Sequence, residues 1–145
     1  MQLTRYSDLS LRVLTYLALH SGDLATIEEI AGAYGISRAH VMKVAHRLGR
    51  AGFLETVRGR RGGVRLARAP EEIRVGDVVR HTEDRMHLVE CFDPSTCDCR
   101  IEPACALRGV LEEALDAFLR TLDRYTLADL VARRRKPLAR LLALG

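Results

Sequence analysis

Between Thr26 and Ala67 the sequence passes from two short amphipathic helices to two short strands, an order that few folds accommodate. Thr26 and Glu29 form a capping box for the first helix, which Gly35 ends. Ser37 can cap the second helix, SRAHVMKVAHRLGRAG, whose inward positions are Val41, Val44, Ala45 and Leu48. FLETV and VRLA are typical of short strands, and the glycine-rich turn RGRRGG joins them. Together these segments predict a winged helix-turn-helix domain.

Basic residues gather in the same half of the chain. Residues 1–70 carry eleven Lys or Arg against five Asp or Glu, whereas residues 71–145 carry twelve against fourteen. A basic winged helix is typical of a protein that binds double-stranded DNA. Candidates for contact with the major groove are Ser37, Arg38, His40 and Lys43. Candidates for the minor groove or for phosphates are the wing residues Arg58, Arg60 and Arg61. Arg47 is a candidate for contact with phosphates, with a purely surface position as the alternative.

Outside the winged domain the sequence predicts further helices, which gives a mainly α fold with a small β-wing and a long dimerisation helix. A first helix should run from about Ser7 to His20 with Ser7 or Asp8 as its cap, and a short helix from about Val75 to His81. A last helix, from about Leu127, should end at Arg134 in a solvated basic tail, residues 133–136. The helix after Pro103 carries an apolar stripe of Leu107, Val110, Leu111, Ala114, Leu115, Phe118, Leu119 and Leu122.

This stripe lacks an obvious partner helix of similar length within the sequence. We therefore expect the same helix of a second subunit to cover it, which gives a homodimer and a palindromic operator. Burial against the chain's own winged domain is the alternative. The chain then divides into the winged domain, 1–70, a connecting segment, 71–90, a cysteine loop, 91–105, and the dimerisation and C-terminal helices, 106–145.

All four cysteines lie in the cysteine loop, with the spacing Cys91-x5-Cys97-x-Cys99-x5-Cys105. The N-terminus does not resemble a signal peptide, and the longest apolar runs are too short for a membrane span, so we expect a cytoplasmic protein in which disulfides are rare. A structural zinc site usually contains C-x2-C pairs, which this loop lacks. An iron–sulphur cluster tolerates wider spacing and a fourth ligand other than thiolate. The spacing favours a cluster and leaves structural zinc as the alternative.

The motifs of common enzyme classes are not recognisable in this sequence. We find neither a Ser-His-Asp set nor a phosphate-binding loop nor a paired-carboxylate motif, and the five histidines are scattered. The sequence therefore predicts a regulator rather than an enzyme.

The segment ECF followed by CRIEPACAL, Cys99 to Leu107, resembles the nitric-oxide-sensing repressors of the NsrR family, as do the N-terminal MQLTRYSDLSLRVLTYLA and the wing RGRRGGVRLA. The resemblance extends to about Tyr125. It implies that Cys91, Cys99 and Cys105 ligate an iron–sulphur cluster, and that Asp8 reaches across the dimer as the fourth ligand. A role as helix cap is the alternative for Asp8. We favour a 4Fe–4S over a 2Fe–2S cluster.

Cys97 departs from the family's three-cysteine pattern. A spare thiol is the favoured interpretation, with a replacement ligand or a fourth ligand in place of Asp8 as alternatives. Nitric oxide as the signal is implied by the resemblance, and a cluster that senses iron or redox state is the alternative. A sister branch that controls cluster biogenesis has a histidine two or three residues after the third cysteine, where this chain has Leu107 and Arg108.

Overall fold

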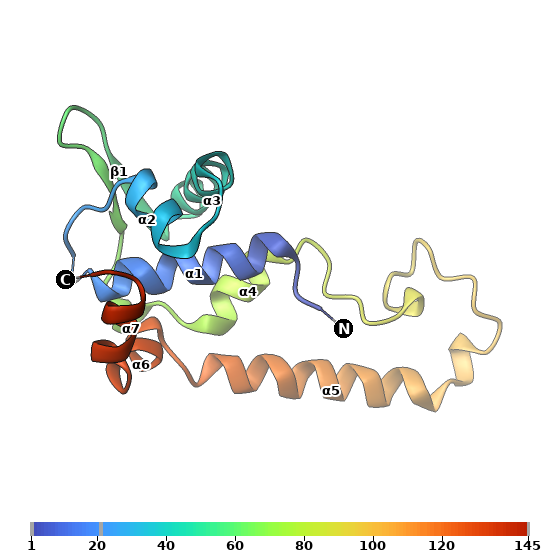
Figure 1. Ribbon diagram of the computed structural model, residues 1–145. Coiled ribbons are helices and arrows are strands. Elements are labelled where there is room, and N and C mark those ends of the chain that lie inside the picture. The colour runs from blue at the N-terminus through green and yellow to red at the C-terminus, as the bar shows by residue number, and fades with distance from the viewer. Residues whose placement is uncertain (1, 21, 145) are drawn as a thin grey trace.

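The computed structural model describes residues 2–20 and 22–144 and confirms the mainly α fold with a small β-wing (Figure 1). The winged helix-turn-helix arrangement consists of α1 (Arg5–Leu19), α2 (Ile27–Tyr34), α3 (Arg38–Arg50), β1 (Leu54–Val57) and β2 (Gly63–Leu66). The remaining α-helices are α4 (Val75–Thr82), α5 (Ala106–Asp123), α6 (Leu127–Ala132) and α7 (Arg135–Leu141). Short 3-10 turns lie at Pro70–Glu72, Glu90–Phe92 and Glu102–Ala104.

Helix α1 is the centre of the core and packs against α3, α4 and α6. Val13, Leu14 and Leu17 on this helix are almost fully buried. All four positions of α3 that the sequence pattern directs inward are buried as well, at Val41, Val44, Ala45 and Leu48. Burial of these side chains fixes which face of α3 stays in solvent, because an amphipathic helix has one apolar side.

The start of α1 differs from the expectation. The helix begins at Arg5 with Thr4 as its cap, and the Ser7 amide donates a hydrogen bond to Thr4 Oγ1 over 3.2 Å. The prediction of Ser7 or Asp8 as the cap is therefore wrong. Asp8 lies in the first turn, where its carboxylate pairs with Arg12 at 2.8 Å. Thr4 competes successfully because its extended backbone presents the hydroxyl to the free amides of the first turn.

The wing is an antiparallel hairpin in which Leu54 pairs with Leu66 and Val57 with Gly63. The chain just before α2 joins it, because the Ala25 amide donates to the Val64 carbonyl over 2.9 Å and the Val64 amide to the Ala25 carbonyl over 2.8 Å. Both residues are buried. The wing is thus fixed to the helix-turn-helix by backbone hydrogen bonds.

The C-terminal segment also corrects the sequence analysis. Helix α6 ends at Ala132, and the basic run 133–136, which is exposed as expected, continues into α7 rather than forming a tail. An Arg135 Nη atom donates to the Leu19 carbonyl over 2.7 Å, so the end of α1 anchors this segment. Pro137 stands in the first turn of α7, where its missing amide hydrogen is not needed.

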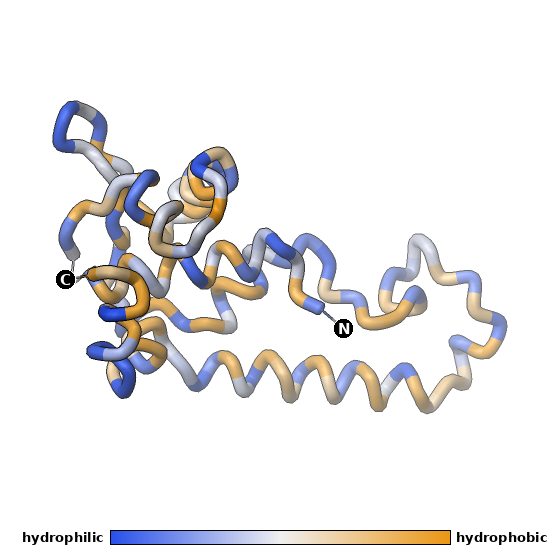
Figure 2. The backbone as a smooth tube through the Cα atoms, in the orientation of Figure 1, coloured by the Kyte–Doolittle hydropathy of each residue, from blue (hydrophilic) through white to orange (hydrophobic). Residues whose placement is uncertain are grey.

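Helix α5 extends away from the winged domain and contacts α4 near its own C-terminal end (Figure 1). Arg80 of α4 makes two hydrogen bonds of 2.6 Å to the carboxylate of Asp123, and these bonds lower the pKa of that carboxyl. Apolar and polar residues alternate along the rest of the helix (Figure 2), and none of its residues is buried. Five residues of the stripe are nevertheless half-buried within the single chain, namely Leu111, Leu115, Phe118, Leu119 and Leu122. The chain's own domain therefore covers the stripe in part, and the dimer stays a prediction.

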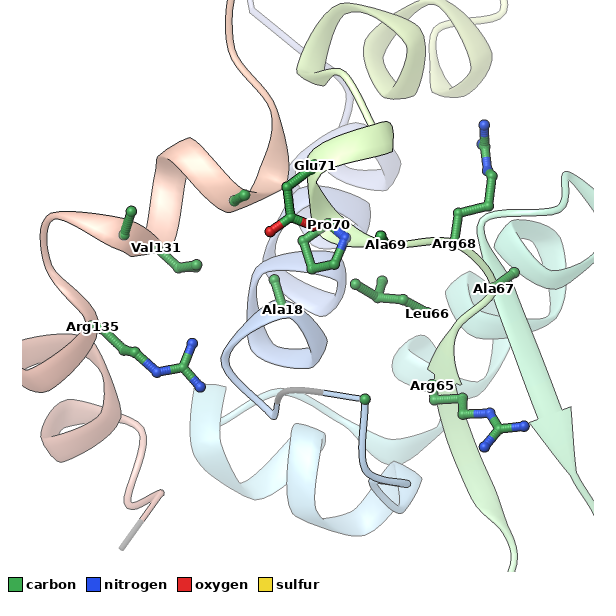
Figure 3. A pocket seen from close by; sticks show the side chains of 13 residues that line it. Ala18, Arg65, Leu66, Ala67, Arg68, Ala69, Pro70, Glu71, Val131 and Arg135 are labelled. Carbon is green, nitrogen blue, oxygen red and sulfur yellow. The ribbon is translucent and has the colours of Figure 1, made fainter.

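A groove of about 640 Å³ lies between the base of the wing and α6 (Figure 3). Its walls include Ala18, Pro70 and Val131, and the guanidinium groups of Arg65 and Arg68 point away from it. We assign no ligand to this groove. Among the described residues, no helix combines the length and apolar character needed to cross a membrane.

Candidate DNA interface and cysteine loop

The exposed start of α3 is organised by its cap. Ser37 Oγ accepts a hydrogen bond from the His40 amide over 3.3 Å and lies 2.7 Å from His40 Nδ1. This contact engages one edge of the imidazole ring and leaves Nε2 on the opposite edge, which faces away from the serine. Ser37 and His40 are both exposed, so this pair can be presented to a DNA groove.

The remaining predicted contacts on α3 have different surroundings. Lys43 is exposed, and Arg38 pairs with Glu28 of α2 at 2.8 Å while both side chains remain more than half exposed. Such a pair contributes little to stability, so a phosphate can replace Glu28. Arg47 is half-buried, and its guanidinium lies 3.7 Å from the centre of the Tyr6 ring. Arg47 therefore faces α1 as well as solvent.

Sequence reasoning missed Met42, whose side chain is 54% exposed on the same helix. It lies four residues after Arg38, and this spacing places both on one face. The helical spacing of Met42 relative to Arg38 could have revealed this position from the sequence. An apolar residue in an amphipathic helix is, however, ordinarily assigned to the core. An exposed apolar side chain beside basic ones suits contact with a thymine methyl group.

The wing tip, residues 58–61, carries the three arginines predicted there, and Arg58, Arg60 and Arg61 are all exposed. Gly59 has φ of +116°, which disfavours any other residue. A Cβ on Gly62 would lie 2.2 Å from the Val57 carbonyl oxygen, so the turn also requires glycine there. The wing tip and the start of α3 lie on the same side of the domain (Figure 1).

The cysteine loop, residues 91–105, lies at the other end of the molecule, beyond α5 (Figure 1). All four thiols are free, Cys99 is exposed and the other three are half-exposed. Cys91 sits in a 3-10 turn, and Cys105 directly precedes the first turn of α5. Asp93 is held by hydrogen bonds from the Ser95 hydroxyl and amide, which lower its pKa.

Within the residues that the structure describes, no three His, Cys, Asp or Glu side chains are close enough to hold a metal ion. Asp8 lies in the first turn of α1 and is separated from the cysteine loop of its own chain (Figure 1). The donor set nevertheless fits a cluster by its chemistry, because several accessible thiols lie on one short loop. The loop has to close around such a group to hold it.

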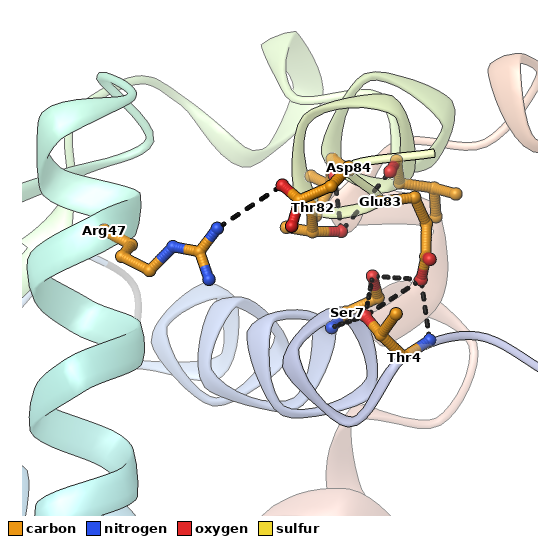
Figure 4. Close-up of polar contacts among 8 residues, drawn as sticks. Thr4, Ser7, Arg47, Thr82, Glu83 and Asp84 are labelled. Atoms are coloured by element: carbon orange, nitrogen blue, oxygen red, sulfur yellow. Dashed lines mark hydrogen bonds and ion pairs between the residues drawn. The ribbon is translucent and has the colours of Figure 1, made fainter. Parts of the chain in front are cut away.

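A further feature joins the residues that follow α4 to α1 and α3, and sequence reasoning missed it. The Glu83 carboxylate, just after α4, accepts hydrogen bonds from Thr4 and Ser7 at the start of α1 (Figure 4). The neighbouring Asp84 lies 3.7 Å from Arg47 of α3. No local pattern could have revealed these contacts, because the partners are 76 or more residues apart for Glu83 and 37 apart for Asp84.

Comparison with known proteins adds independent information. The model of the family Rrf2, described as an iron-dependent transcriptional regulator, matches residues 3–133. Proteins named HTH-type transcriptional regulator NsrR from Halalkalibacterium halodurans and from Bacillus subtilis are each 54% identical over 132 residues, which covers 90% of this chain and 90% of each relative. The family match spans the winged domain, the cysteine loop and α5.

Solved structures agree on the fold. A structure described as T. potens IscR has a TM-score of 0.73 at 25% identity and covers 92% of this chain and 88% of that chain. The structure of CymR, described as the global cysteine regulator of B. subtilis, has a TM-score of 0.72 at 24% identity and covers 92% and 98%. At this level of identity the second likeness concerns the fold alone.

Proposed function

Because the chain belongs to the Rrf2 family of transcriptional regulators, we propose that it is a DNA-binding repressor whose operator affinity is controlled by an iron–sulphur cluster that reacts with nitric oxide. The family membership confirms the expected regulator rather than an enzyme, and the relatives' names confirm the NsrR resemblance. The control by a cluster and by nitric oxide is the part that experiment has to test.

The observation that carries the proposal is the division of the molecule into two chemically different ends. The start of α3 and the wing tip offer basic and polar side chains on one side of the winged domain. The cysteine loop offers four accessible thiols at the far end of α5. A chain that carries both a candidate DNA-binding surface and a loop of accessible thiols is suited to be a regulator that responds to a chemical signal.

In the proposed complex with DNA, Ser37 and His40 enter the major groove together with Arg38 and Lys43. The wing tip lies over the adjacent minor groove, where guanidinium groups are favoured by the narrow groove of A·T-rich sequences. A homodimer formed through the exposed stripe of α5 places two such surfaces on a palindromic operator.

Cys91, Cys99 and Cys105 would hold the cluster as thiolates, and Asp8 of the partner subunit would provide a carboxylate as the fourth ligand. When bound, the cluster supplies iron that reacts with nitric oxide. A carboxylate is a weaker ligand for iron than a thiolate, so the Asp8 position is the one most open to exchange. Arg12 pairs with Asp8 in this structure, and the lone pairs of a carboxylate are numerous enough for Asp8 to bind iron while it keeps this partner.

The test is an absorption spectrum of protein purified without oxygen, followed by stepwise addition of nitric oxide and an operator-binding assay on the same samples. A visible band that bleaches with nitric oxide while DNA binding is lost supports the proposal. A colourless protein with stoichiometric zinc that still binds DNA overturns the cluster. A coloured protein whose DNA affinity ignores nitric oxide overturns the signal.

Matched cysteine variants assign the ligands. Cys99→Ala should abolish the visible band, whereas Cys97→Ala, two residues away, should keep it. The reverse result would show that Cys97 is the ligand. Asp8→Ala that binds cluster and DNA as the wild type does would remove the link across the dimer.

A second candidate is supported by the description of the family model as an iron-dependent regulator. In this case the same cysteines hold a cluster, but its assembly and loss report iron supply or redox state. Operator binding that follows iron chelation or oxygen exposure, and that nitric oxide leaves unchanged, would favour this candidate.

A further inference from the structure

The segment between α4 and the cysteine loop begins with an acidic pair, of which Glu83 faces the start of α1 and Asp84 faces Arg47 of α3 (Figure 4). One carboxylate oxygen of Glu83 accepts three hydrogen bonds: from the Thr4 amide over 2.7 Å, from the Thr4 hydroxyl over 3.1 Å and from the Ser7 hydroxyl over 2.5 Å. The residue that starts the route into the cysteine loop therefore holds the first turn of α1.

The same turn of α1 contacts the recognition helix. Tyr6 lies between Thr4 and Ser7 in sequence, and its ring is stacked against the Arg47 guanidinium of α3 at 3.7 Å. Asp84, which follows α4, also lies 3.7 Å from the Arg47 guanidinium. Residues 83–84, the first turn of α1 and Arg47 thus form one continuous set of contacts (Figure 4).

The Glu83–Ser7 contact is stronger than the Asp84–Arg47 contact because it is more deeply buried. The Ser7 side chain is fully buried and Glu83 is half-buried, so their hydrogen bond is shielded from water. The Asp84 side chain is 86% exposed, and an ion pair of this kind contributes little. Glu83 is therefore the residue on which the set of contacts depends, and Asp84 reinforces it.

We propose that Glu83 is a positioning residue that transmits the state of the cysteine loop to the recognition helix, through Thr4 and Ser7 to the first turn of α1 and through Tyr6 to Arg47. The inference rests on the proposed function in one respect, namely that the loop changes state. Glu83 fixes α1 and α3 relative to each other. A change in the state of the loop, carried along residues 85–90, alters this constraint and with it the presentation of α3 to DNA.

The quantity to measure is the ratio of operator dissociation constants for apo and cluster-loaded protein, obtained by fluorescence anisotropy on a labelled operator duplex. Glu83→Ala removes all three hydrogen bonds and should lower this ratio at least fivefold while the visible band per subunit stays at the wild-type level. Glu83→Gln keeps an acceptor oxygen and should stay within about twofold of wild type. The matched control is Glu71→Ala, which removes an equal charge from an exposed residue and should leave the ratio unchanged.

A wild-type ratio in Glu83→Ala overturns the inference. If Glu83→Ala does not fold, Ser7→Ala serves instead, since it deletes one buried hydroxyl, and it should lower the ratio at least threefold. A purely structural role would shift both dissociation constants together and leave the ratio in place, which also overturns the inference.

If the proposed function itself is wrong, the wild-type protein gives a result that differs from both outcomes above. If wild-type protein binds the operator equally well in both forms, the cluster does not control binding. The link from Glu83 to α3 is then tested in apo protein alone, with a double-mutant cycle of Glu83→Ala and Arg47→Gln on operator affinity. A departure from additivity of threefold or more supports the link, and additive effects overturn it.

Discussion

Replacement of Gly63 by alanine tests how the wing is held. A Cβ at this position would lie 2.6 Å from the Ala25 carbonyl oxygen, a distance that real Cβ atoms essentially never show. Because the obstacle is backbone, it cannot rotate away as a side chain can. The expected response is that β2 and the chain at Ala25 separate, which breaks the two hydrogen bonds between Ala25 and Val64.

The magnitude follows from burial. Ala25 and Val64 are 0% and 3% exposed, so breaking their hydrogen bonds leaves buried polar groups unsatisfied or lets water into the core. Each broken bond costs about 1–3 kcal/mol. Replacement of glycine returns up to about 1 kcal/mol by restricting the unfolded chain. We expect a net destabilisation of about 2 kcal/mol, which is roughly 6 °C in the midpoint of thermal unfolding for a chain of this size.

The assay is thermal unfolding followed by circular dichroism, with operator binding measured on the same preparation. Gly32→Ala is the matched control, because its Cβ would meet no atom within 4 Å and it lies inside α2. This control should raise stability by up to about 1 kcal/mol. If Gly63→Ala unfolds at the wild-type temperature and binds the operator normally, the Ala25–Val64 bridge does not hold the wing.

Three further outcomes are expected. The double substitution Arg60→Ala and Arg61→Ala should weaken operator binding and leave the unfolding temperature unchanged. The slope of log affinity against log salt concentration should become less steep by about 0.9 for each phosphate that the wing no longer neutralises. An unchanged slope would exclude phosphate binding by the wing tip. Met42→Ala should weaken operator binding about threefold to tenfold without lowering stability, since the side chain is exposed, and equal affinity would exclude Met42 from the reading surface. Hydrogen bonds from Thr26 lower the pKa of Glu29, so this capping box stabilises the folded state above the unfolded-state pKa of about 4.3, and the contribution is lost as pH falls through the lower folded-state pKa. Urea unfolding of wild type and of Glu29→Gln should therefore show a difference in unfolding free energy of less than about 1 kcal/mol near pH 6 that disappears near pH 3. A difference that does not depend on pH would contradict this assignment.

The sequence predicted those parts of the fold that depend on neighbouring residues. The capping box of Thr26 and Glu29 and the cap of α3 at Ser37 are confirmed, because both ends of each contact lie within one turn. The hairpin is confirmed for the same reason, since the glycines of the turn fix its register. Local hydrogen bonding and apolar spacing were sufficient in each case.

The errors arose where distant residues decide the local structure. Thr4 and Ser7 are both capping residues by type, and the choice of Thr4 is reinforced by Glu83, which lies 79 residues later. The basic run near the C-terminus resembles a tail in isolation, yet Arg135 reaches the carbonyl at the end of α1 and α7 forms there. Neither contact leaves a periodic pattern in the sequence.

In the candidate site, too, features set by neighbouring residues were predictable and contacts between distant residues were not. The arginines of the wing tip and the exposed residues at the start of α3 were predictable, because turn chemistry and helix periodicity determine their positions. The role of Arg47 was not predictable, since its contacts with Tyr6 and Asp84 come from two other elements. The prediction of a phosphate contact for Arg47 remains a prediction, and it now competes with a role inside the protein.

Helix α5 links the proposed dimer to the proposed cluster. Its contacts with α4 lie near Asp123, whereas Leu107 and Val110 near its other end are 61% and 59% exposed. These two residues belong to the apolar stripe that we propose as the dimer contact. Cys105 directly precedes that exposed end, so a second α5 that covers the stripe in the proposed dimer would also restrict the cysteine loop. Dilution of the protein below its dimer dissociation constant should therefore release the cluster without any nitric oxide, whereas a cluster that survives in monomers would separate loop geometry from dimerisation.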